Sequence, residues 1–241
     1  MSQLAVELTD LRFAWPRQAP ILEIPSFQLR EREHLLLKGP SGAGKTTLLS
    51  LIAGVLTPLS GEVQVAGQNL GALSASGRDG FRADAMGLMF QQFNLIPFLD
   101  VKQNISLALG FSRKRMAAAT RERPLSGEID RLLAGLGLDA SSIAGKTAGQ
   151  LSVGQQQRVA AVRALIGRPR ILIADEPTSA LDPDARADFL KLIFAECRTA
   201  GISLIVVSHD TEIAPLFDRT EDLRHLNRAA AAPTAAGQAC G

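Results

Sequence analysis

The sequence predicts an α/β fold with a mainly parallel sheet, an N-terminal antiparallel β subdomain and an inserted α-helical subdomain. Three observations support this prediction. Apolar runs of strand length recur at three distant places, and each ends in a polar or Gly-rich turn, as buried parallel strands do. Apolar residues alternate before the first run, which is typical of antiparallel strands with one exposed face. Between the first and second runs lies a long segment with helical spacing.

The expected strands fall into two groups. Leu4–Leu8 and Ile21–Leu29 alternate and are separated by prolines, so they predict short antiparallel strands. Leu35–Lys38, Ile171–Ala174 and Ile202–Val207 are almost continuously apolar and predict buried parallel strands. The carboxyl ends of parallel strands share one edge of the sheet, and ligands bind there. We therefore expect the active site at that edge.

Two helical regions are expected. The segment from about 112 to 168 is rich in Ala, Leu and Arg at helical spacing and predicts the helical subdomain, with Ser126 as an N-cap and Gly137 as a stop. Asp182, followed by proline, predicts the start of a later helix that ends at Gly201. Three apolar residues would form the core face of that helix: Phe189, Leu192 and Ile193.

We expect one domain over 1–227, with the helical subdomain inserted in it. The last stretch, 228–241, is dominated by alanine and has no periodic apolar face, so it predicts a disordered tail. Cys197 is expected to pack inside its helix. Its separation from Cys240 fits neither a disulfide framework nor a metal site, which favours a reducing compartment.

The composition excludes several classes of protein. Hydrophobic residues make up 46% and charged residues 21% of the 241 residues, which excludes a disordered, collagen-like or coiled-coil chain. With 26 Lys and Arg against 24 Asp and Glu, the net charge of +2 does not by itself indicate nucleic-acid binding. The apolar runs are far shorter than the roughly 20 residues of a membrane span, and the N-terminus lacks the pattern of a signal peptide.

One motif predicts a phosphate-binding loop. It follows a predicted strand and precedes a helical run, Thr47–Ala53, and it matches the pattern GxxxxGK[ST] in full. Its glycines let the backbone curl and aim N–H groups at phosphate oxygens, while Lys45 reaches the β- and γ-phosphates and Thr46 ligates Mg²⁺. The alternative is a Gly-rich turn with a chance lysine. The candidate nucleotide-binding residues are those of the loop and the threonine that follows it: Gly39, Pro40, Ser41, Gly42, Ala43, Gly44, Lys45, Thr46 and Thr47.

Two carboxylates end the strand that begins at Ile171. Asp175 is a candidate ligand for the metal, and Glu176 is a candidate general base that polarises the attacking water. Because this strand end is expected beside the phosphate loop, the pair fits an NTPase core. The alternative is a solvated acidic turn.

The segment 151–158, LSVGQQQR, resembles the signature motif of the ATP-binding-cassette ATPases. In that family the serine and the start of the following helix bind the γ-phosphate of ATP held by a second subunit, which agrees with the affinity of helix N-termini for anions. The resemblance therefore implies ATP, Mg²⁺ and a dimer, as a homodimer. The residues that it places at the nucleotide are Ser152, Gly154 and Gln155.

Three further segments match the family in the expected order. Gln91 resembles the Q-loop glutamine, which contacts Mg²⁺ and water; Ser179–Asp182 resembles the D-loop, with Asp182 near the nucleotide. His209 resembles the switch histidine, which contacts the γ-phosphate, although a lone histidine there is more often a capped strand end. The resemblance covers about 4–227 and implies that Lys45, Gln91, Glu176 and His209 carry the hydrolysis.

Two features near the nucleotide are particular to this chain. The family stacks an aromatic residue on adenine, and Trp15 aligns better than Phe13; the alternative is that either ring packs in the core. The signature usually has glycine where this chain has Val153. A β-branched side chain beside the γ-phosphate contact predicts slower closure or hydrolysis.

The segment 87–107 resembles the lipoprotein-release and macrolide-export ATPases and their cell-division relative. This implies a separate membrane permease and a location at the cytoplasmic face of the inner membrane. Leu95, Ile96 and Phe98 are candidates either for a groove that receives the permease or for core packing. The alternatives are a soluble cassette ATPase without a transport role, or a slow-turnover docking module.

A basic run in the helical region allows two interpretations. Arg113, Lys114 and Arg115, with Arg121 and Arg123 further on, are favoured to form a solvated helical face. The alternative is contact with lipid headgroups or with the permease.

Overall fold

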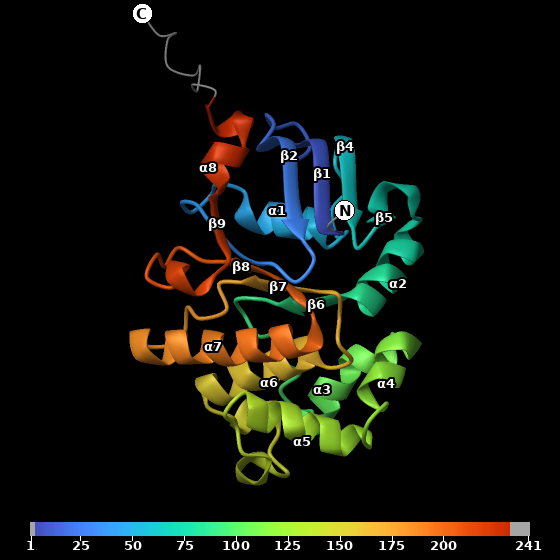
Figure 1. Cartoon of the computed structure of the whole chain (residues 1–241), viewed down its shortest axis with the longest axis vertical. Coiled ribbons are helices and arrows are strands. Elements are labelled where there is room, and N and C mark those ends of the chain that lie inside the picture. Colours follow the sequence, from blue (N-terminus) through green and yellow to red (C-terminus); the bar gives the residue numbers. More distant parts are fainter. Residues whose placement is uncertain (1–2, 232–241) are drawn as a thin grey trace, which may run out of the picture.

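The computed structural model describes residues 3–231. An antiparallel sheet of four strands lies at one end of the molecule, in the order β2-β1-β4-β5 (Figure 1). Its strands are β1 (Leu4–Phe13), β2 (Leu22–Arg30), β4 (Ser60–Val65) and β5 (Gln68–Asn69). The predicted antiparallel pair is confirmed; β1 is longer than expected, and β2 is shifted by one residue.

A second sheet of five strands is parallel throughout, in the order β6-β7-β8-β3-β9. Its strands are β3 (His34–Lys38), β6 (Met86–Met89), β7 (Ile171–Asp175), β8 (Ser203–Val207) and β9 (Arg219–Asp222). The three parallel strands expected from the sequence are β3, β7 and β8. The predicted fold class is confirmed.

Eight α-helices are described in residues 3–231, and Figure 1 shows α1 between the sheets and α3 to α7 on the other side of the parallel sheet. They are α1 (Lys45–Ile52), α2 (Ala75–Ala85), α3 (Val101–Gly110), α4 (Arg113–Ala119), α5 (Leu125–Gly135), α6 (Val153–Leu165), α7 (Pro183–Ala200) and α8 (Leu223–Leu226). Short 3-10 helices cover Leu70–Ala72, Ala140–Ile143, Ala148–Gln150, Ala214–Leu216 and Arg228–Ala231. The structure thus adds α3 to the helical region expected over 112–168.

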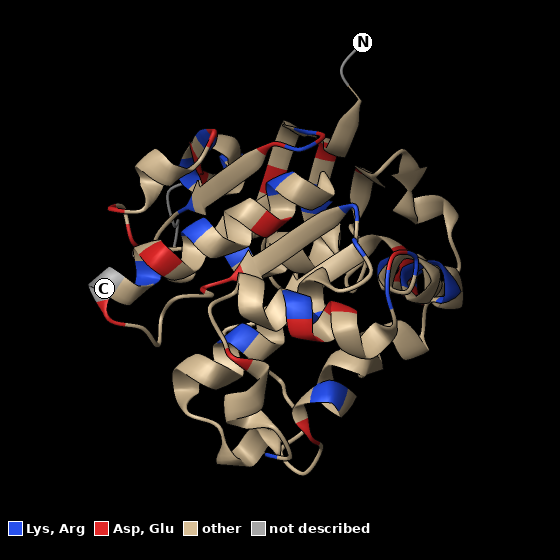
Figure 2. Ribbon diagram, turned by 60° about the horizontal axis from the view of Figure 1, so that its bottom comes forward, with Lys and Arg blue, Asp and Glu red and all other residues tan. Residues whose placement is uncertain are grey.

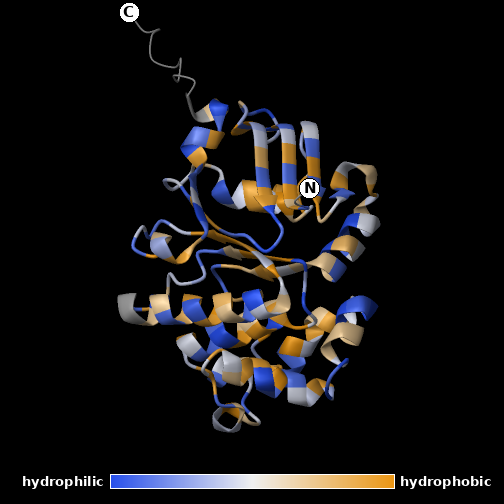
Figure 3. Ribbon diagram, viewed as in Figure 1, coloured by the Kyte–Doolittle hydropathy of each residue, from blue (hydrophilic) through white to orange (hydrophobic). Residues whose placement is uncertain are grey.

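The parallel sheet separates two hydrophobic cores. Leu37, Ile173 and Ile205 pack with the antiparallel sheet and α1, whereas their neighbours Leu36 and Leu172 pack with α6 and α7 on the opposite face. Successive side chains of a strand point to opposite faces, so a strand covered on both sides is apolar at every position. This accounts for the hydrophobic colour of the central strands in Figure 3.

Several predicted helix ends are confirmed and one is wrong. The side chain of Asp182 accepts a hydrogen bond from the backbone of Ala185 at the start of α7, and Gly201 ends α7 with φ 70°. Gly137 follows α5 with φ 69°. Ser126 is not the N-cap of α5, because the helix already begins at Leu125 after a proline.

The interpretation of the basic run as a solvated face is wrong for Arg115. Figure 2 shows basic and acidic residues interspersed along the helices, and Arg113 and Lys114 are exposed. Arg115 is only 4% exposed, and its guanidinium donates to the carbonyl oxygens of Met86 and Ile166, each at 3.0 Å. Burial lowers its pKa to about 10, so it remains charged at neutral pH.

The remaining sequence expectations concern the chain end, the cysteines and membrane spans. The expected tail begins with the 3-10 helix Arg228–Ala231, and 232–241, with Cys240, lie outside the described residues. Cys197 is buried in α7 as predicted, and burial raises the pKa of its thiol to about 12. Among residues 3–231, no helix has the length and apolarity needed to cross a bilayer.

Candidate active site

The phosphate loop connects β3 to α1, at the edge of the parallel sheet where the sequence placed the site. Gly42 and Gly44 have φ of 78° and 95°, which favour glycine. A Cβ on Gly44 would also lie 2.9 Å from Leu22 Cδ2. The glycines therefore allow the loop to turn tightly into α1, whose first backbone N–H groups lack partners within the helix and are suited to an anion.

Lys45 is the first residue of α1, and its side chain folds back over the loop. Its Nζ donates to the carbonyl oxygens of Gly39 at 2.7 Å and Pro40 at 2.9 Å. The ammonium group is thereby held beside the backbone that the motif offers to phosphate oxygens. A positive charge at this point complements the negative charge of a nucleoside triphosphate.

Thr46 and Asp175 bring two oxygen groups together from different elements. Thr46 Oγ1 donates to Asp175 Oδ2 at 2.8 Å, which links α1 to the end of β7. Burial, and then the neighbouring charge of Glu176, raise the pKa of Asp175, while the Thr46 hydrogen bond opposes this rise. A hydroxyl and a carboxylate supply the oxygen ligands that Mg²⁺ prefers, and Mg²⁺ bound to nucleotide needs only one or two such protein groups. The donor set therefore fits Mg²⁺.

Glu176 and His209 meet at the ends of two neighbouring strands. Asp175 of β7 pairs with Val207 of β8, so the residues just beyond these positions lie side by side. His209 Nδ1 is 3.0 Å from Glu176 Oε1. The Glu176 backbone has φ 49°, a conformation that costs energy in a residue other than glycine, and its N–H donates to Val207 O at 2.9 Å. The structure thus fixes the carboxylate in a contact that suits a general base.

These groups line one cavity of about 580 Å³, a size typical of small-molecule sites. The predicted residues that line it are Trp15, Ser41, Gly42, Gly44, Lys45, Thr46, Thr47, Gln91, Asp175, Glu176 and His209. Trp15 is 41% exposed, whereas Phe13 is buried and forms a T-shaped contact with it. The indole, and not the Phe13 ring, is therefore available to a ligand.

The signature residues do not line this cavity. Ser152 caps α6: its Oγ accepts from the Gln155 backbone at 3.3 Å, and Gln155 Oε1 accepts from the Ser152 backbone at 3.0 Å. Val153 is 51% exposed beside them. Gly154 and Asp182 are likewise absent from the lining of the cavity. One copy of the chain therefore does not bring all the predicted nucleotide-binding residues together.

The family model for the ABC transporter matches residues 22–179. The chain belongs to the ABC transporter family. It is 35% identical to the lipoprotein-releasing system ATP-binding protein LolD of Syntrophotalea carbinolica, over 89% of this chain and 92% of the relative. It is 37% identical to the LolD of Anaeromyxobacter dehalogenans, over 90% of each.

Solved structures support the same assignment. The dimeric structure of MJ0796, described as a bacterial ABC transporter cassette, has a TM-score of 0.78 and 30% identity, over 90% of this chain and 93% of that one. A dimeric post-hydrolysis state of that cassette, bound to ADP and Pi, has a TM-score of 0.79 and 32% identity, over 93% and 95% of the two chains. The family resemblance is thus confirmed: the chain is an ATP-binding and ATP-hydrolysing subunit of the ABC transporter type.

Two residues that line the cavity of this ABC cassette were not among the predicted site residues. Ser179 lies in the D-loop segment that the sequence identified without assigning it to the site. Ile21 precedes β2, and nothing in its local sequence distinguishes it from a core residue. Its place in the site depends on the pairing of β1 and β2, which brings it near the Trp15 segment.

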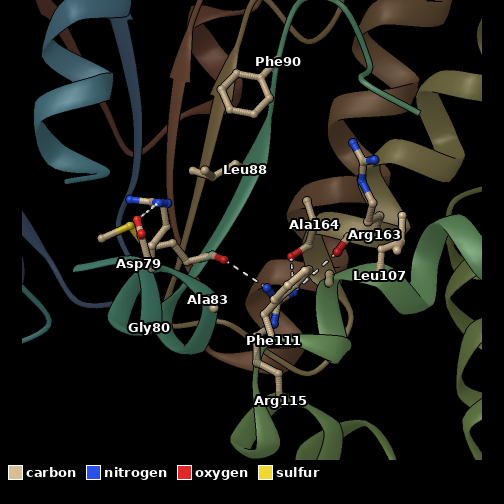
Figure 4. Close-up of a pocket in the computed structure, with 13 residues that line it drawn as sticks. Asp79, Gly80, Ala83, Leu88, Phe90, Leu107, Phe111, Arg115, Arg163 and Ala164 are labelled. Atoms are coloured by element: carbon tan, nitrogen blue, oxygen red, sulfur yellow. Dashed lines mark hydrogen bonds and ion pairs between the residues drawn. The ribbon is translucent and has the colours of Figure 1, made fainter. Parts of the chain in front are cut away.

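A second cavity of about 530 Å³ lies between β6 and the helical region of the cassette (Figure 4). We call it the lateral groove; it is lined mainly by apolar side chains, with Phe90 and Phe111 at 45% and 78% exposure. The sequence offered three other residues, Leu95, Ile96 and Phe98, either for such a groove or for core packing. The core-packing alternative holds for Leu95, which packs against the core, and neither Ile96 nor Phe98 lines the groove.

Proposed function

We propose that this chain is the ATPase subunit of a transporter of the lipoprotein-release and macrolide-export group, and that two copies close head to tail around two ATP molecules. The observation that carries the proposal is the position of Ser152. It caps α6 away from the cavity that holds Lys45 and Glu176. A second copy supplies Ser152 to that cavity, which agrees with the dimeric cassettes among the similar structures.

Each part of the cavity has a role toward ATP in this proposal. Lys45 and the loop backbone bind the phosphates, Trp15 stacks on the adenine, and Thr46 and Asp175 hold Mg²⁺ together with Gln91. The metal, when bound, neutralises charge that develops on the transferred phosphoryl group. The Thr46–Asp175 hydrogen bond already places two of its ligands in contact.

Hydrolysis then depends on Glu176 and His209. Glu176 accepts a proton from the water that attacks the γ-phosphate, a general-base role that contributes about 10²- to 10⁴-fold to the rate. His209 orients the carboxylate through the 3.0 Å contact and also faces the γ-phosphate. Loss of the products reopens the dimer and completes the cycle.

The lateral groove is the proposed binding site for a segment of the membrane permease. An apolar groove of this kind suits a short amphipathic helix. Phe90 lies in the groove and is followed directly by Gln91, which lines the ATP cavity. Movement of the permease would therefore reach the site through adjacent residues. In this arrangement the chain works at the cytoplasmic face of the inner membrane.

Sedimentation of the Glu176→Gln variant tests the dimer. With Mg²⁺ and saturating ATP we expect a stable dimer, because nucleotide binds but is not cleaved. Lys45→Ala should weaken nucleotide binding and leave a monomer. A variant Glu176→Gln that remains monomeric at saturating ATP, or a parent chain that releases no phosphate even with its permease present, contradicts the proposal.

One observation favours a second candidate, a docking module with slow turnover. Val153 is half exposed at the first position of α6, next to the serine that would face the other subunit's ATP. A β-branched side chain there hinders close approach to the γ-phosphate more than glycine does. Single-turnover hydrolysis, with Glu176→Gln as the inactive control, separates this candidate from an active ATPase.

A further inference from the structure

One guanidinium group joins two loops beside the candidate active site. Arg186 lies near the start of α7, and its side chain is 28% exposed. Its Nε donates to the carbonyl oxygen of Leu181 at 2.9 Å, and its Nη1 donates to Asp210 Oδ2 at 3.1 Å. A single planar group therefore connects the loop before α7 to the loop after β8.

Asp210 is held in place by several contacts. Its carboxylate, at 13% exposure, also accepts from the backbone of Glu212 at 2.9 Å, and its own backbone N–H donates to Ser208 Oγ at 3.1 Å. His209 precedes Asp210 directly, and its side chain is 72% exposed. Packing constrains such an exposed imidazole little, so its direction depends on the contact with Glu176 and on the backbone that Asp210 fixes.

The other acceptor of Arg186 belongs to the Ser179–Asp182 loop. Ser179 lines the ATP cavity on one side, and His209 and Glu176 line it as well. Asp182 anchors the far end of the loop by capping α7. By contacting Leu181 and Asp210 together, Arg186 sets the separation of these two walls of the cavity.

We propose that Arg186 is a positioning residue for ATP hydrolysis: it holds Asp210, and through it the His209–Glu176 pair, in register with the Ser179–Asp182 loop. The inference rests on the proposed function, since it requires Glu176 to act as the general base. The role is geometric, because a partly exposed ion pair contributes little to stability. The planar fork of arginine contacts both acceptors at once, which the point charge of lysine does not reproduce.

The test uses the full chain with Mg²⁺ and ATP, and measures single-turnover phosphate release separately from nucleotide affinity. Arg186→Ala should slow hydrolysis about 10- to 100-fold, the range expected when a reacting group loses its orientation. Nucleotide affinity should change by less than about twofold, because Lys45 and Thr46 are not touched. Arg186→Lys should restore part of the rate.

A double-mutant cycle adds a measurement that distinguishes a positioning role from a merely structural one. Asp210→Asn keeps the shape of the side chain while it removes the ion pair, so it should slow hydrolysis by a similar factor. The Arg186→Ala and Asp210→Asn losses should not multiply, because both variants break the same link. Amide hydrogen exchange at 208–212 should also be faster in Arg186→Ala.

Arg198→Ala is the matched control on the same helix. Arg198 pairs with Asp218 at 3.6 Å, and the two side chains are 63% and 46% exposed. This variant should hydrolyse ATP like the parent. The inference is overturned if Arg186→Ala hydrolyses ATP within about twofold of the parent rate, or if the two losses multiply in the double variant. If Arg186→Ala does not fold, a parent-like rate for Asp210→Asn overturns it. Failure of the proposed function is distinguished because the parent itself then releases no phosphate.

Discussion

Arg115 is expected to contribute more to the free energy of unfolding than the exposed basic residues next to it in the sequence. Its side chain donates to backbone carbonyls at the start of β6 and at the end of α6, and Figure 4 shows it at the lateral groove beside Ala164. Arg115→Met keeps the length and apolar stem of the side chain and removes every donor. The carbonyl oxygens of Met86, Ala164 and Ile166 then lose a charged partner in a buried place.

The expected cost follows from these acceptors. An unsatisfied buried polar group costs about 1 to 3 kcal/mol, so three carbonyls, partly relieved by their other contacts, amount to about 4 kcal/mol. Relief of the burial of the Arg115 charge reduces the loss but does not reverse it, since the carbonyls remain buried. With a urea slope of about 3 kcal/mol per M, the midpoint of unfolding should fall by about 1.3 M.

Urea unfolding of three chains checks this prediction. Arg113 lies on the same helix and is exposed, so Arg113→Met should change the free energy of unfolding by less than about 0.5 kcal/mol. Arg115→Lys should fall between the parent and Arg115→Met, because one ammonium group satisfies fewer acceptors. Equal midpoints for Arg113→Met and Arg115→Met would refute the reasoning.

Three further predictions concern other parts of the molecule. Gly44→Ala should abolish tight ATP binding, because its Cβ would lie 2.9 Å from Leu22 Cδ2 and φ there is 95°; equilibrium dialysis measures this, and parent-like affinity contradicts it. Val153→Gly should raise the single-turnover rate by opening the approach to the γ-phosphate, and an unchanged rate removes the idea. Burial lowers the pKa of His34, whose two ring nitrogens have no partner within the described residues, so the unfolded state binds the proton more readily. Stability should therefore fall as the pH drops below about 6.5, and urea midpoints of His34→Leu should depend less on pH than those of the parent.

The sequence was sufficient wherever a few neighbouring residues determine the backbone. The phosphate loop, the Asp182 cap and the Gly201 stop depend on local φ and on hydrogen bonds three residues apart, and the structure has each of these features. The family resemblance supplied His209, and the rule that the carboxyl ends of parallel strands share an edge accounts for its contact with Glu176. Local chemistry and this rule placed the phosphate loop, Asp175 and Glu176 at this cavity, whereas Trp15, Gln91 and His209 came from the resemblance to the ATP-binding-cassette family.

Strand β6 was not predicted, because its residues satisfy the packing of a helix as well as strand formation. It has only four residues, and one of them is Gly87, which is unfavourable in a strand. A Cβ on Gly87 would lie 2.3 Å from the carbonyl oxygen of Ala164, so the glycine permits α6 to approach the sheet closely. That requirement comes from a residue far along the chain, and no local pattern expresses it.

The same limit explains why the arginines that donate to main-chain carbonyls were misjudged or overlooked. Arg115, Arg163 and Arg186 all donate to main-chain carbonyls, Arg163 to those of Phe93 and Asn94 at 2.6 and 2.7 Å. A carbonyl is present at every residue, so the sequence does not indicate which carbonyl accepts the hydrogen bond. Arg115 was assigned to a solvated face because it stands in a run of basic residues. The residues that join β6 to α6 are therefore found only from the three-dimensional arrangement. Because Arg115 donates to the main-chain carbonyls of Met86 and Ile166, substitution of the side chains of these two residues should not reproduce the loss expected for Arg115→Met.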